Sequence, residues 1–390
     1  MKKLHLIVDL IKLIIAKCVS PLLKLDRGYR DVWIIGERKG EAKDNGYHLF
    51  KYIRENYPER KVYYAIERDS GDWDKVYSLG NVLVYDSLKH YILYVISTKL
   101  ICAHLGSCVP DSPVCWKFYD SEIKNKKKVF IQHGITIGDV SVLKYEKSKC
   151  DLFLCGGKPE YEFVRSAFGY PQGNVLYTGF ARFDNLHNYE VKEQILVMPT
   201  WRQWIPSATW NTGDIEQCRD LFLQSDYYHS YNSLINSKTL IHLLEKYNLN
   251  LIFYPHYEMQ GYIDLFSSDS SRVTIAKKDE YDVQQLLKDS KILITDYSSI
   301  AFDFAYMRKL VIYYQFDETE YYKNHYKRGY FDYKEHGFGP VAYDSTELDA
   351  YVGKILDGTL DDSYKDRSRV FFEKFDNKNC ERIYDAVVKL

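Results

Sequence analysis

Residues 291–304, with the sequence KILITDYSSIAFDF, place hydroxyl and carboxyl groups where a buried strand meets a helix. The apolar run Ile292–Ile294 is typical of a parallel strand, and Ser298 or Ser299 is expected to cap the helix that follows. Free N–H groups at such a helix start bind anions. Because Ser299 and Asp303 share one helix face, that face could present a hydroxyl to a phosphate and a carboxylate to a sugar or polyol. An ordinary capped helix with a solvated acid explains the same pattern.

A histidine follows another apolar run, FIQHG at residues 130–134. The run delivers His133 to the carboxyl end of a strand, and Gly134 permits a tight turn or the close approach of a ligand. A histidine in this place can accept a proton near neutral pH, because its unperturbed pKa is about 6.5. The alternative is a strand-end histidine that is hydrogen-bonded to a loop.

Two arginines also follow strand ends. Arg182 comes just after the glycine turn of VLYTGFARFD, and Thr200 and Arg202 follow the strand in ILVMPTWR. A guanidinium group can donate two parallel hydrogen bonds to a phosphate, so both arginines are candidate phosphate ligands. A surface arginine stacked on Trp201 or Trp204 is the alternative for Arg202.

With LIFYPH at residues 251–256, five strand ends carry polar residues of one kind: His133; Arg182; Thr200 with Arg202; His256; and Ser298 and Ser299 with Asp303. Such a set is typical of phosphate binding. The chain has no G-x-x-x-x-G-K-[ST] stretch, which excludes a P-loop ATPase, and no G-x-G-x-x-G after its first strand, which argues against a dinucleotide oxidoreductase. The sequence has no clustered carboxylates for a metal site. The spacing of common zinc ligands is also missing from Cys102, His104, Cys108 and Cys115.

The composition narrows the class of protein further. A chain of 390 residues with 46% hydrophobic residues exceeds a typical single core, so we expect two domains. The 53 Lys and Arg residues balance 54 Asp and Glu residues, so no global basic field exists for nucleic-acid binding. The eight cysteines follow no C-x-x-C spacing, which indicates reduced thiols rather than a disulfide framework.

From residue 31 onward, short apolar runs alternate with helical patterns, which predicts parallel, doubly wound sheets. We expect strands at residues 32–35, 62–66, 82–85, 99–103, 129–132 and 152–155, and a second series from 195 to 314. Residues 234–247 are expected to form one helix, and 203–232 an irregular segment with short helices. The predicted domains are a doubly wound α/β half at 28–190 and a second at 191–390. Ligands of such sheets bind beyond the carboxyl ends of the strands, so we expect a phosphate-bearing ligand in the cleft between the halves.

The N-terminal residues 1–27 are expected to form an amphipathic helix. Its apolar runs are broken by charged residues and are too short to span a membrane. A broad leucine and isoleucine stripe, with Lys2, Lys3, Lys12 and Lys17 outside it, suits a helix in the interface of an anionic membrane. A helix docked on the protein's own core is an equal alternative.

Five motifs stand in the order found in one known family: QHG at 132–134, TGFARFD at 178–184, PTWR at 199–202, YPH at 254–256 and TDYSSIAFDF at 295–304. In this respect the chain resembles the CDP-glycerol glycerophosphotransferases, which include teichoic-acid primases and polymerases and related capsule enzymes. The resemblance implies a GT-B-like fold of two facing Rossmann-like domains and peripheral attachment to the cytoplasmic face of the membrane. The chain departs from many members at Gln132, Ala181 and Tyr254, where those members have Trp, Pro and a basic residue.

The resemblance also implies roles for the motif residues. His133 would be the base that activates the acceptor hydroxyl, and His256 would neutralise the reacting phosphate, so these two form the expected catalytic pair. Asp303 would bind ribose or glycerol hydroxyls of the donor. The remaining expected substrate-binding residues are Gln132, Gly134, Arg182, Pro199, Thr200, Arg202, Ser298 and Ser299.

By this resemblance, the chain is expected to transfer glycerol phosphate, or a related alditol phosphate, to a hydroxyl of a lipid-linked or polysaccharide acceptor, releasing CMP. The donor would be CDP-glycerol or CDP-ribitol, no cofactor is firmly implied, and a need for a divalent metal stays open. Two alternatives are a GT-B glycosyltransferase that uses a nucleotide sugar and a non-catalytic membrane-bound scaffold for wall or capsule assembly.

Overall fold

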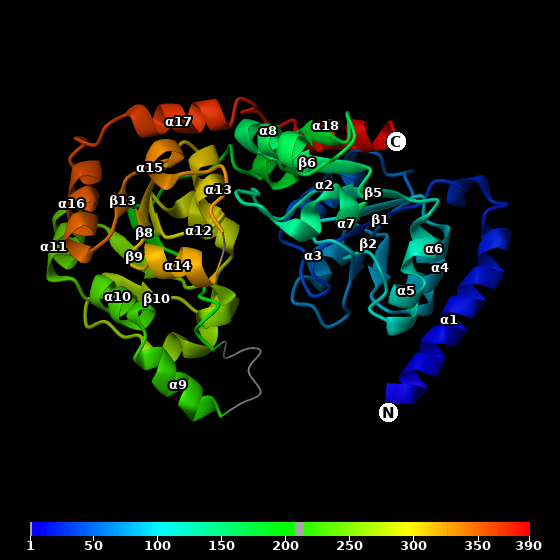
Figure 1. Ribbon diagram of the computed structural model, residues 1–390, viewed down its shortest axis with the longest axis horizontal. Coiled ribbons are helices and arrows are strands. Elements are labelled where there is room, and N and C mark those ends of the chain that lie inside the picture. The colour runs from blue at the N-terminus through cyan, green and yellow to red at the C-terminus, as the bar shows by residue number, and fades with distance from the viewer. Residues whose placement is uncertain (1, 207–213, 326) are drawn as a thin grey trace. The chain divides into compact units, whose positions relative to one another are not determined.

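The structure is a computed structural model that describes residues 2–206, 214–325 and 327–390. The chain forms two compact units (Figure 1). Unit 1 comprises Met1–Ile135, Val140–Asn185 and Lys374–Leu390, and unit 2 comprises Thr136–Asp139 and Leu186–Glu373. Each unit is built around its own parallel sheet.

Unit 1 contains a sheet of seven parallel strands in the order β3-β2-β1-β4-β5-β6-β7. The strands are β1 (Trp33–Gly36), β2 (Val62–Ile66), β3 (Val82–Val84), β4 (Lys99–Cys102), β5 (Lys127–Phe130), β6 (Leu152–Cys155) and β7 (Val175–Tyr177). The helices are α1 (Lys2–Leu23), α2 (Asn45–Asn56), α3 (Trp73–Tyr77), α4 (Leu88–Ile96), α5 (Pro113–Lys117), α6 (Tyr119–Ile123), α7 (Tyr145–Ser148), α8 (Lys158–Ala167) and α18 (Asn379–Val388). The order of the strands reverses direction between β1 and β4, where ligands of such sheets bind.

Both faces of this sheet are buried, as expected for a parallel sheet between helices. Trp33 and Tyr64 belong to the hydrophobic cluster on one face, and Ile34 and Ala65 belong to the cluster on the other. This alternation follows the two-residue period of a strand. Because the strands are parallel, their carboxyl ends meet at one edge, and the polar residues that follow them lie there.

Unit 2 contains six parallel strands in the order β10-β9-β8-β11-β12-β13. They are β8 (Gln194–Val197), β9 (Asn250–Phe253), β10 (Val273–Ile275), β11 (Ile292–Thr295), β12 (Leu310–Tyr314) and β13 (Val341–Ala342). The helices are α9 (Ile215–Leu223), α10 (Asp226–Ile235), α11 (Lys238–Lys246), α12 (Val283–Asp289), α13 (Ile300–Tyr306), α14 (Glu318–Asn324), α15 (Tyr333–His336), α16 (Ser345–Leu356) and α17 (Ser363–Phe371). Here the strand order reverses between β8 and β11.

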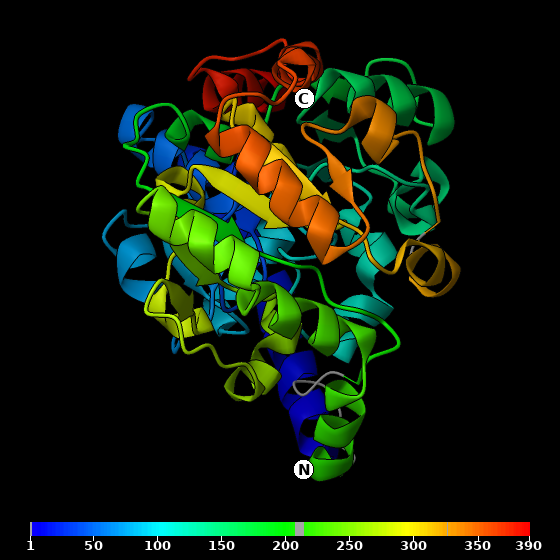
Figure 2. The same cartoon turned by 90° about the vertical axis from the view of Figure 1, so that its left-hand side faces the viewer.

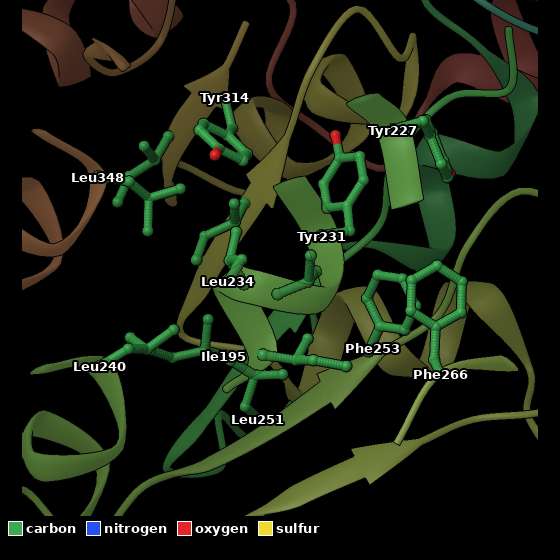
Figure 3. Close-up of a cluster of buried hydrophobic side chains, with 14 of the residues drawn as sticks. Ile195, Tyr227, Tyr231, Leu234, Leu240, Leu251, Phe253, Phe266, Tyr314 and Leu348 are labelled. Atoms are coloured by element: carbon green, nitrogen blue, oxygen red, sulfur yellow. The ribbon is translucent and has the colours of Figure 1, made fainter. Parts of the chain in front are cut away.

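Helices α10, α11 and α16 cover one face of the unit 2 sheet (Figure 2), and a hydrophobic core cluster joins them to it. Leu240 of α11 and Leu348 of α16 join Ile195 and Leu251 of the sheet, and the Tyr231 and Phe253 rings add a tilted aromatic contact (Figure 3). Burial of this size fixes the sheet and hence the loops at its edge.

Helix α1 packs on unit 1 with part of its apolar surface and leaves the rest exposed, so it has features of both interpretations of the N-terminal segment. Leu13 and Ala16 are buried in a unit 1 cluster against α4. The rest of the apolar surface is open, and the large exposed side chains include Leu4, Ile7, Leu10, Ile11 and Ile14. Within the described residues, no helix is long and apolar enough to cross a membrane.

Two lysines of this helix differ from the expectation that they face lipid headgroups. Lys17 Nζ lies 2.6 Å from Glu122, and Lys12 Nζ donates to the Asp86 carbonyl at 2.9 Å. Both ammonium groups therefore bind unit 1 itself, because acceptors on the neighbouring elements lie within reach of their flexible side chains.

Three predicted segments also differ from the structure. The helix expected at 234–247 is interrupted, because Ser237 accepts a hydrogen bond from the Leu240 N–H and starts α11 as a new helix. The segment expected to be irregular contains α9 and α10, and its residues 207–213 lie outside the described residues. Residues 374–390, expected in the second half, belong to unit 1, because α18 packs on α2.

Candidate functional site

In unit 1, the turn after β5 presents His133. Gln132 has a φ of +57°, a left-handed conformation that is uncommon for a residue other than glycine. Its buried side chain donates to the Leu154 carbonyl at 2.7 Å and to Glu160 at 3.0 Å, and its own carbonyl accepts from Asn45 at 2.8 Å. Gln132 thus shapes the turn that exposes His133, and Gly134 after it is half-buried.

The hydrogen bond of His133 assigns its tautomer. Nδ1 lies 3.3 Å from the Ala103 carbonyl, and a carbonyl can only accept, so Nδ1 carries the hydrogen and Nε2 carries the lone pair. Although the side chain is exposed, desolvation by the surrounding protein lowers its pKa; Asp44 opposes this shift, and Arg182 and Arg38 reinforce it. The ring is therefore neutral near pH 7 and able to accept a proton.

Arg182 binds groups of its own unit. Its guanidinium is buried, with Nη1 2.7 Å from the Asp44 carboxylate and 3.2 Å from the His133 carbonyl. Asp44 is 138 residues earlier in the chain, so this ion pair is not evident from the sequence. Arg182 therefore holds the backbone of the His133 turn.

Sequence reasoning missed Glu37, which occupies the start of α2. Its buried carboxyl oxygens accept from the backbone N–H groups of Lys43, Asp44 and Tyr47 at 2.7–3.1 Å. Burial and the neighbouring Asp44 raise the pKa of Glu37 to about 8, against the opposing effect of these N–H groups. An acidic residue directly after a strand was the only signal in the sequence. The helix start that binds phosphate in many such folds is here filled by the protein's own side chain.

In unit 2, the serine stretch after β11 starts helix α13. Ser298 Oγ accepts from the Ile300 N–H at 3.4 Å, whereas Ser299 is exposed and has no side-chain capping hydrogen bond. Asp303 is buried one turn further along the helix. Of the two serines, Ser299 is thus the one whose side chain is open to solvent.

His256 follows β9 and begins a 3₁₀ helix at Tyr257–Leu265. Its Nδ1 accepts from the Glu258 N–H at 3.3 Å, so Nε2 is the nitrogen that carries the hydrogen in the neutral ring. Its backbone N–H donates to the carbonyl of Pro199 at 3.2 Å. Pro199 is buried and thus contributes through its carbonyl.

Arg202 differs most from its expected role. Its side chain is fully buried; Nη1 lies 2.7 Å from Asp296, and Nε and Nη2 donate to both oxygens of Asp317 at 2.6 and 3.1 Å. Desolvation opposes its charge, but the two carboxylates outweigh it and raise the pKa of the guanidinium. The Arg202 guanidinium is therefore held in a buried ion-pair network of its own unit.

The two carboxylates around Arg202 were not predicted. Asp296 also accepts from the Thr200 N–H at 2.9 Å and from the Tyr231 hydroxyl at 3.2 Å. This network joins the ends of β8 and β11, where the order of the strands reverses, and so fixes Thr200 beside the serine stretch. Asp296 lies inside the motif TDYSS, but its partner Arg202 is 94 residues away, so its role is not evident from the sequence.

Among residues 2–206, 214–325 and 327–390, no three or more His, Cys, Asp or Glu side chains form a group able to hold a metal ion. The Cys102 and Cys108 sulfurs lie 3.2 Å apart in the core, and His104 stacks on His133 instead of joining them.

Comparison with known proteins agrees with these features. The family model described as CDP-Glycerol:Poly(glycerophosphate) glycerophosphotransferase matches residues 23–389. The minor teichoic acid biosynthesis protein GgaB of Bacillus subtilis (strain 168) is 36% identical over 369 residues, 93% of this chain and 40% of that protein. The teichoic acid glycerol-phosphate transferase of Staphylococcus aureus (strain NCTC 8325 / PS 47) is 25% identical over 268 residues, 63% of this chain and 62% of that protein. The chain thus spans less than two thirds of either relative.

Solved structures share the fold at low sequence identity. The H548A variant of the wall teichoic acid polymerase TagF superposes with a TM-score of 0.68 at 17% identity, covering 98% of this chain and 97% of that one. The S. aureus MnaA-UDP structure has a TM-score of 0.56 at 15% identity, covering 92% and 96%. The expected GT-B-like α/β fold is thereby confirmed. Since the family model spans nearly the whole chain, the protein belongs to the CDP-glycerol:poly(glycerophosphate) glycerophosphotransferase family.

Proposed function

We propose that the chain transfers glycerol phosphate, or a related alditol phosphate, from a CDP-alditol to a hydroxyl of a lipid-linked or polysaccharide acceptor in teichoic-acid or capsule biosynthesis. The observation that carries this proposal is the opposite tautomers of two strand-end histidines. His133 donates through Nδ1 and keeps a lone pair on Nε2, whereas His256 accepts at Nδ1 and keeps a hydrogen on Nε2. One ring is thus prepared to take a proton and the other to donate to an anion.

The reaction needs both kinds of group. The acceptor hydroxyl attacks the β-phosphorus of the donor, its proton passes to Nε2 of His133, and the bond between the β-phosphorus and the bridging oxygen breaks to release CMP. His256 Nε2–H and the Ser299 hydroxyl donate to nonbridging phosphate oxygens, and Asp303 binds donor hydroxyls. Phosphoryl transfer depends mainly on positioning and charge neutralisation, which these groups supply.

The teichoic-acid functions in the names of the relatives support this substrate class. A donor panel tests it: CDP-glycerol, CDP-ribitol and UDP-sugars, each with membrane lipids or polysaccharide fragments as acceptor. We expect CMP release and phosphorus in the product with a CDP-alditol. Transfer of sugar without phosphorus from a UDP-sugar would instead identify a glycosyltransferase, and no turnover of any donor would favour a scaffold.

We further propose peripheral attachment to the cytoplasmic face of the membrane through the exposed side of α1. The exposed leucine and isoleucine side chains would enter the interface of an anionic bilayer. Co-sedimentation with phosphatidylglycerol vesicles tests this. The triple variant Ile7→Glu, Ile11→Glu, Ile14→Glu should lose vesicle binding but keep turnover of a soluble acceptor fragment, and unchanged binding would contradict the proposal.

A further inference from the structure

Ala103 and His104, two consecutive residues after β4, both contact the ring of His133. The Ala103 carbonyl accepts from Nδ1 at 3.3 Å. The His104 ring lies parallel to the His133 ring, with centroids 4.2 Å apart and 10° between the planes. Strands β4 and β5 are neighbours in the sheet, so their carboxyl ends bring the two histidines together. His104 also follows the strand at which the order of the unit 1 sheet reverses, where ligands bind in such folds.

The two contacts restrain different motions of the ring. A single hydrogen bond at Nδ1 tolerates a range of angles, so it leaves some rotation of the ring about the Cβ–Cγ bond. A flat partner stacked on the ring face removes that rotation and fixes the direction in which the Nε2 lone pair points.

The surroundings of His104 indicate that its ring face matters more than its nitrogens. Its Nδ1 is buried and has no hydrogen-bond partner among the described residues. Burial, His133 and Arg38 lower the pKa of His104 to about 3, so the ring stays neutral. A buried polar atom without a partner costs stability and indicates a residue retained for another reason.

We propose that His104 is a positioning residue that stacks on His133 and holds its Nε2 lone pair toward the acceptor hydroxyl. This inference rests on the proposed function, because it assumes that His133 is the base. His104 itself takes no proton and touches no reacting atom.

Two substitutions distinguish the effect of the flat His104 ring from the effect of its nitrogen atoms. His104→Leu fills the space without a flat ring and should lower kcat about 10- to 100-fold with little change in KM for the donor. His104→Phe keeps a flat ring and removes the buried unpaired nitrogen, so it should retain kcat within about three-fold. Tyr77→Ala, which removes the exposed ring stacked on Trp73 in the same unit, is the matched control and should not change kcat.

The pH profile and a spectroscopic measurement distinguish positioning from a general loss of structure. The charged groups that face His133 are Asp44, Arg38 and Arg182, and none of them changes. His104→Leu should therefore lower kcat without moving its acid limb. In histidine-labelled protein, the ring-proton resonance of His133 should lose its ring-current shift in His104→Leu and keep it in His104→Phe.

Several results would overturn the inference. These are an unchanged kcat in folded His104→Leu, a His104→Phe variant as inactive as His104→Leu, or an acid limb that moves with the substitution. If His104→Phe does not fold, His104→Leu alone decides between the first and last of these. Failure of the proposed function is recognised separately, because His133→Asn would then retain turnover whatever the His104 variants do.

Discussion

The two sheets have the same strand order around the point of reversal, yet their carboxyl-end edges carry different chemistry. In unit 1, the Glu37 carboxyl group occupies the N–H groups at the start of α2, and the neighbouring strands present the stacked His104 and His133. In unit 2, Arg202 binds the acidic residues, and the edge presents hydrogen-bond donors such as Ser299 and His256. The buried charged side chain of each edge, Glu37 or Arg202, binds different neighbours and so leaves different polar groups beside it.

This comparison also explains the two arginines that were expected to bind phosphate. Arg182 and Arg202 both bind carboxylates of their own unit, so neither supplies the positive charge that a free guanidinium would bring. In both units, a buried ion pair orients the loop that carries the reactive groups. Both arginines therefore bind groups of their own unit, and the uncharged donors and acceptors beside them are the groups that we propose meet substrate.

The largest expected effect follows removal of the proposed base. His133→Ala should lower kcat about 10²- to 10⁴-fold and leave the Kd for CDP-glycerol nearly unchanged, because unit 2 is proposed to hold the donor. Isothermal titration and initial rates measure the two quantities, with exposed His242→Ala as control. His256→Ala should instead weaken donor binding. The distinction between the edges fails if His133→Ala weakens donor binding as much as His256→Ala does.

The next effect concerns the buried cation of unit 2. Arg202→Met leaves Asp296 and Asp317 buried without a counter-charge and should lower the free energy of unfolding by about 3–5 kcal/mol, measured by urea denaturation. Arg219→Met, which breaks an exposed ion pair with Asp264, is the control and should barely move the urea midpoint. Normal stability in Arg202→Met would restore Arg202 as a candidate phosphate ligand.

A smaller effect tests the filled helix start of unit 1. Glu37→Gln places an NH₂ group against backbone N–H donors and should cost about 1–3 kcal/mol of unfolding free energy at pH 5. Because the pKa of Glu37 is raised to about 8, the stability it contributes is complete below its ordinary pKa near 4.5 and is lost as the pH rises through 8. The difference between wild type and Glu37→Gln in urea should therefore shrink from pH 5 to pH 8. A difference that grows over this range would show that Glu37 is ionised in the folded protein.

The smallest expected effect sharpens the assignment of the base. Arg38 is exposed and lowers the pKa of His133, so Arg38→Gln should raise that pKa and move the acid limb of kcat/KM to higher pH. Salt should weaken the shift, because exposed charges are screened. Lys39→Gln removes the neighbouring exposed charge and serves as control. A shift to lower pH would mean that the limb belongs to a group other than His133.

Much of the fold was predictable from local patterns. Short apolar runs such as 292–294 and 152–154 are strands, and the helices between them required parallel sheets. The helix expected at 234–247 was wrong in its middle, because Ser237 captures a backbone N–H and starts a new helix, a local preference that the apolar periodicity hides.

The candidate site was predictable only in part. The sequence by itself determined that His133, His256 and the serines 298–299 follow strands, and within each parallel sheet such positions meet at one edge. Only the tertiary structure decided which strand-end side chains face solvent and which are paired inside the protein. Arg202 binds Asp296, 94 residues away in the chain, and Arg182 binds Asp44, 138 residues away. The physical reason is that a strand end fixes where a side chain begins, whereas its charge partner and its tautomer depend on groups that only folding brings within hydrogen-bond distance.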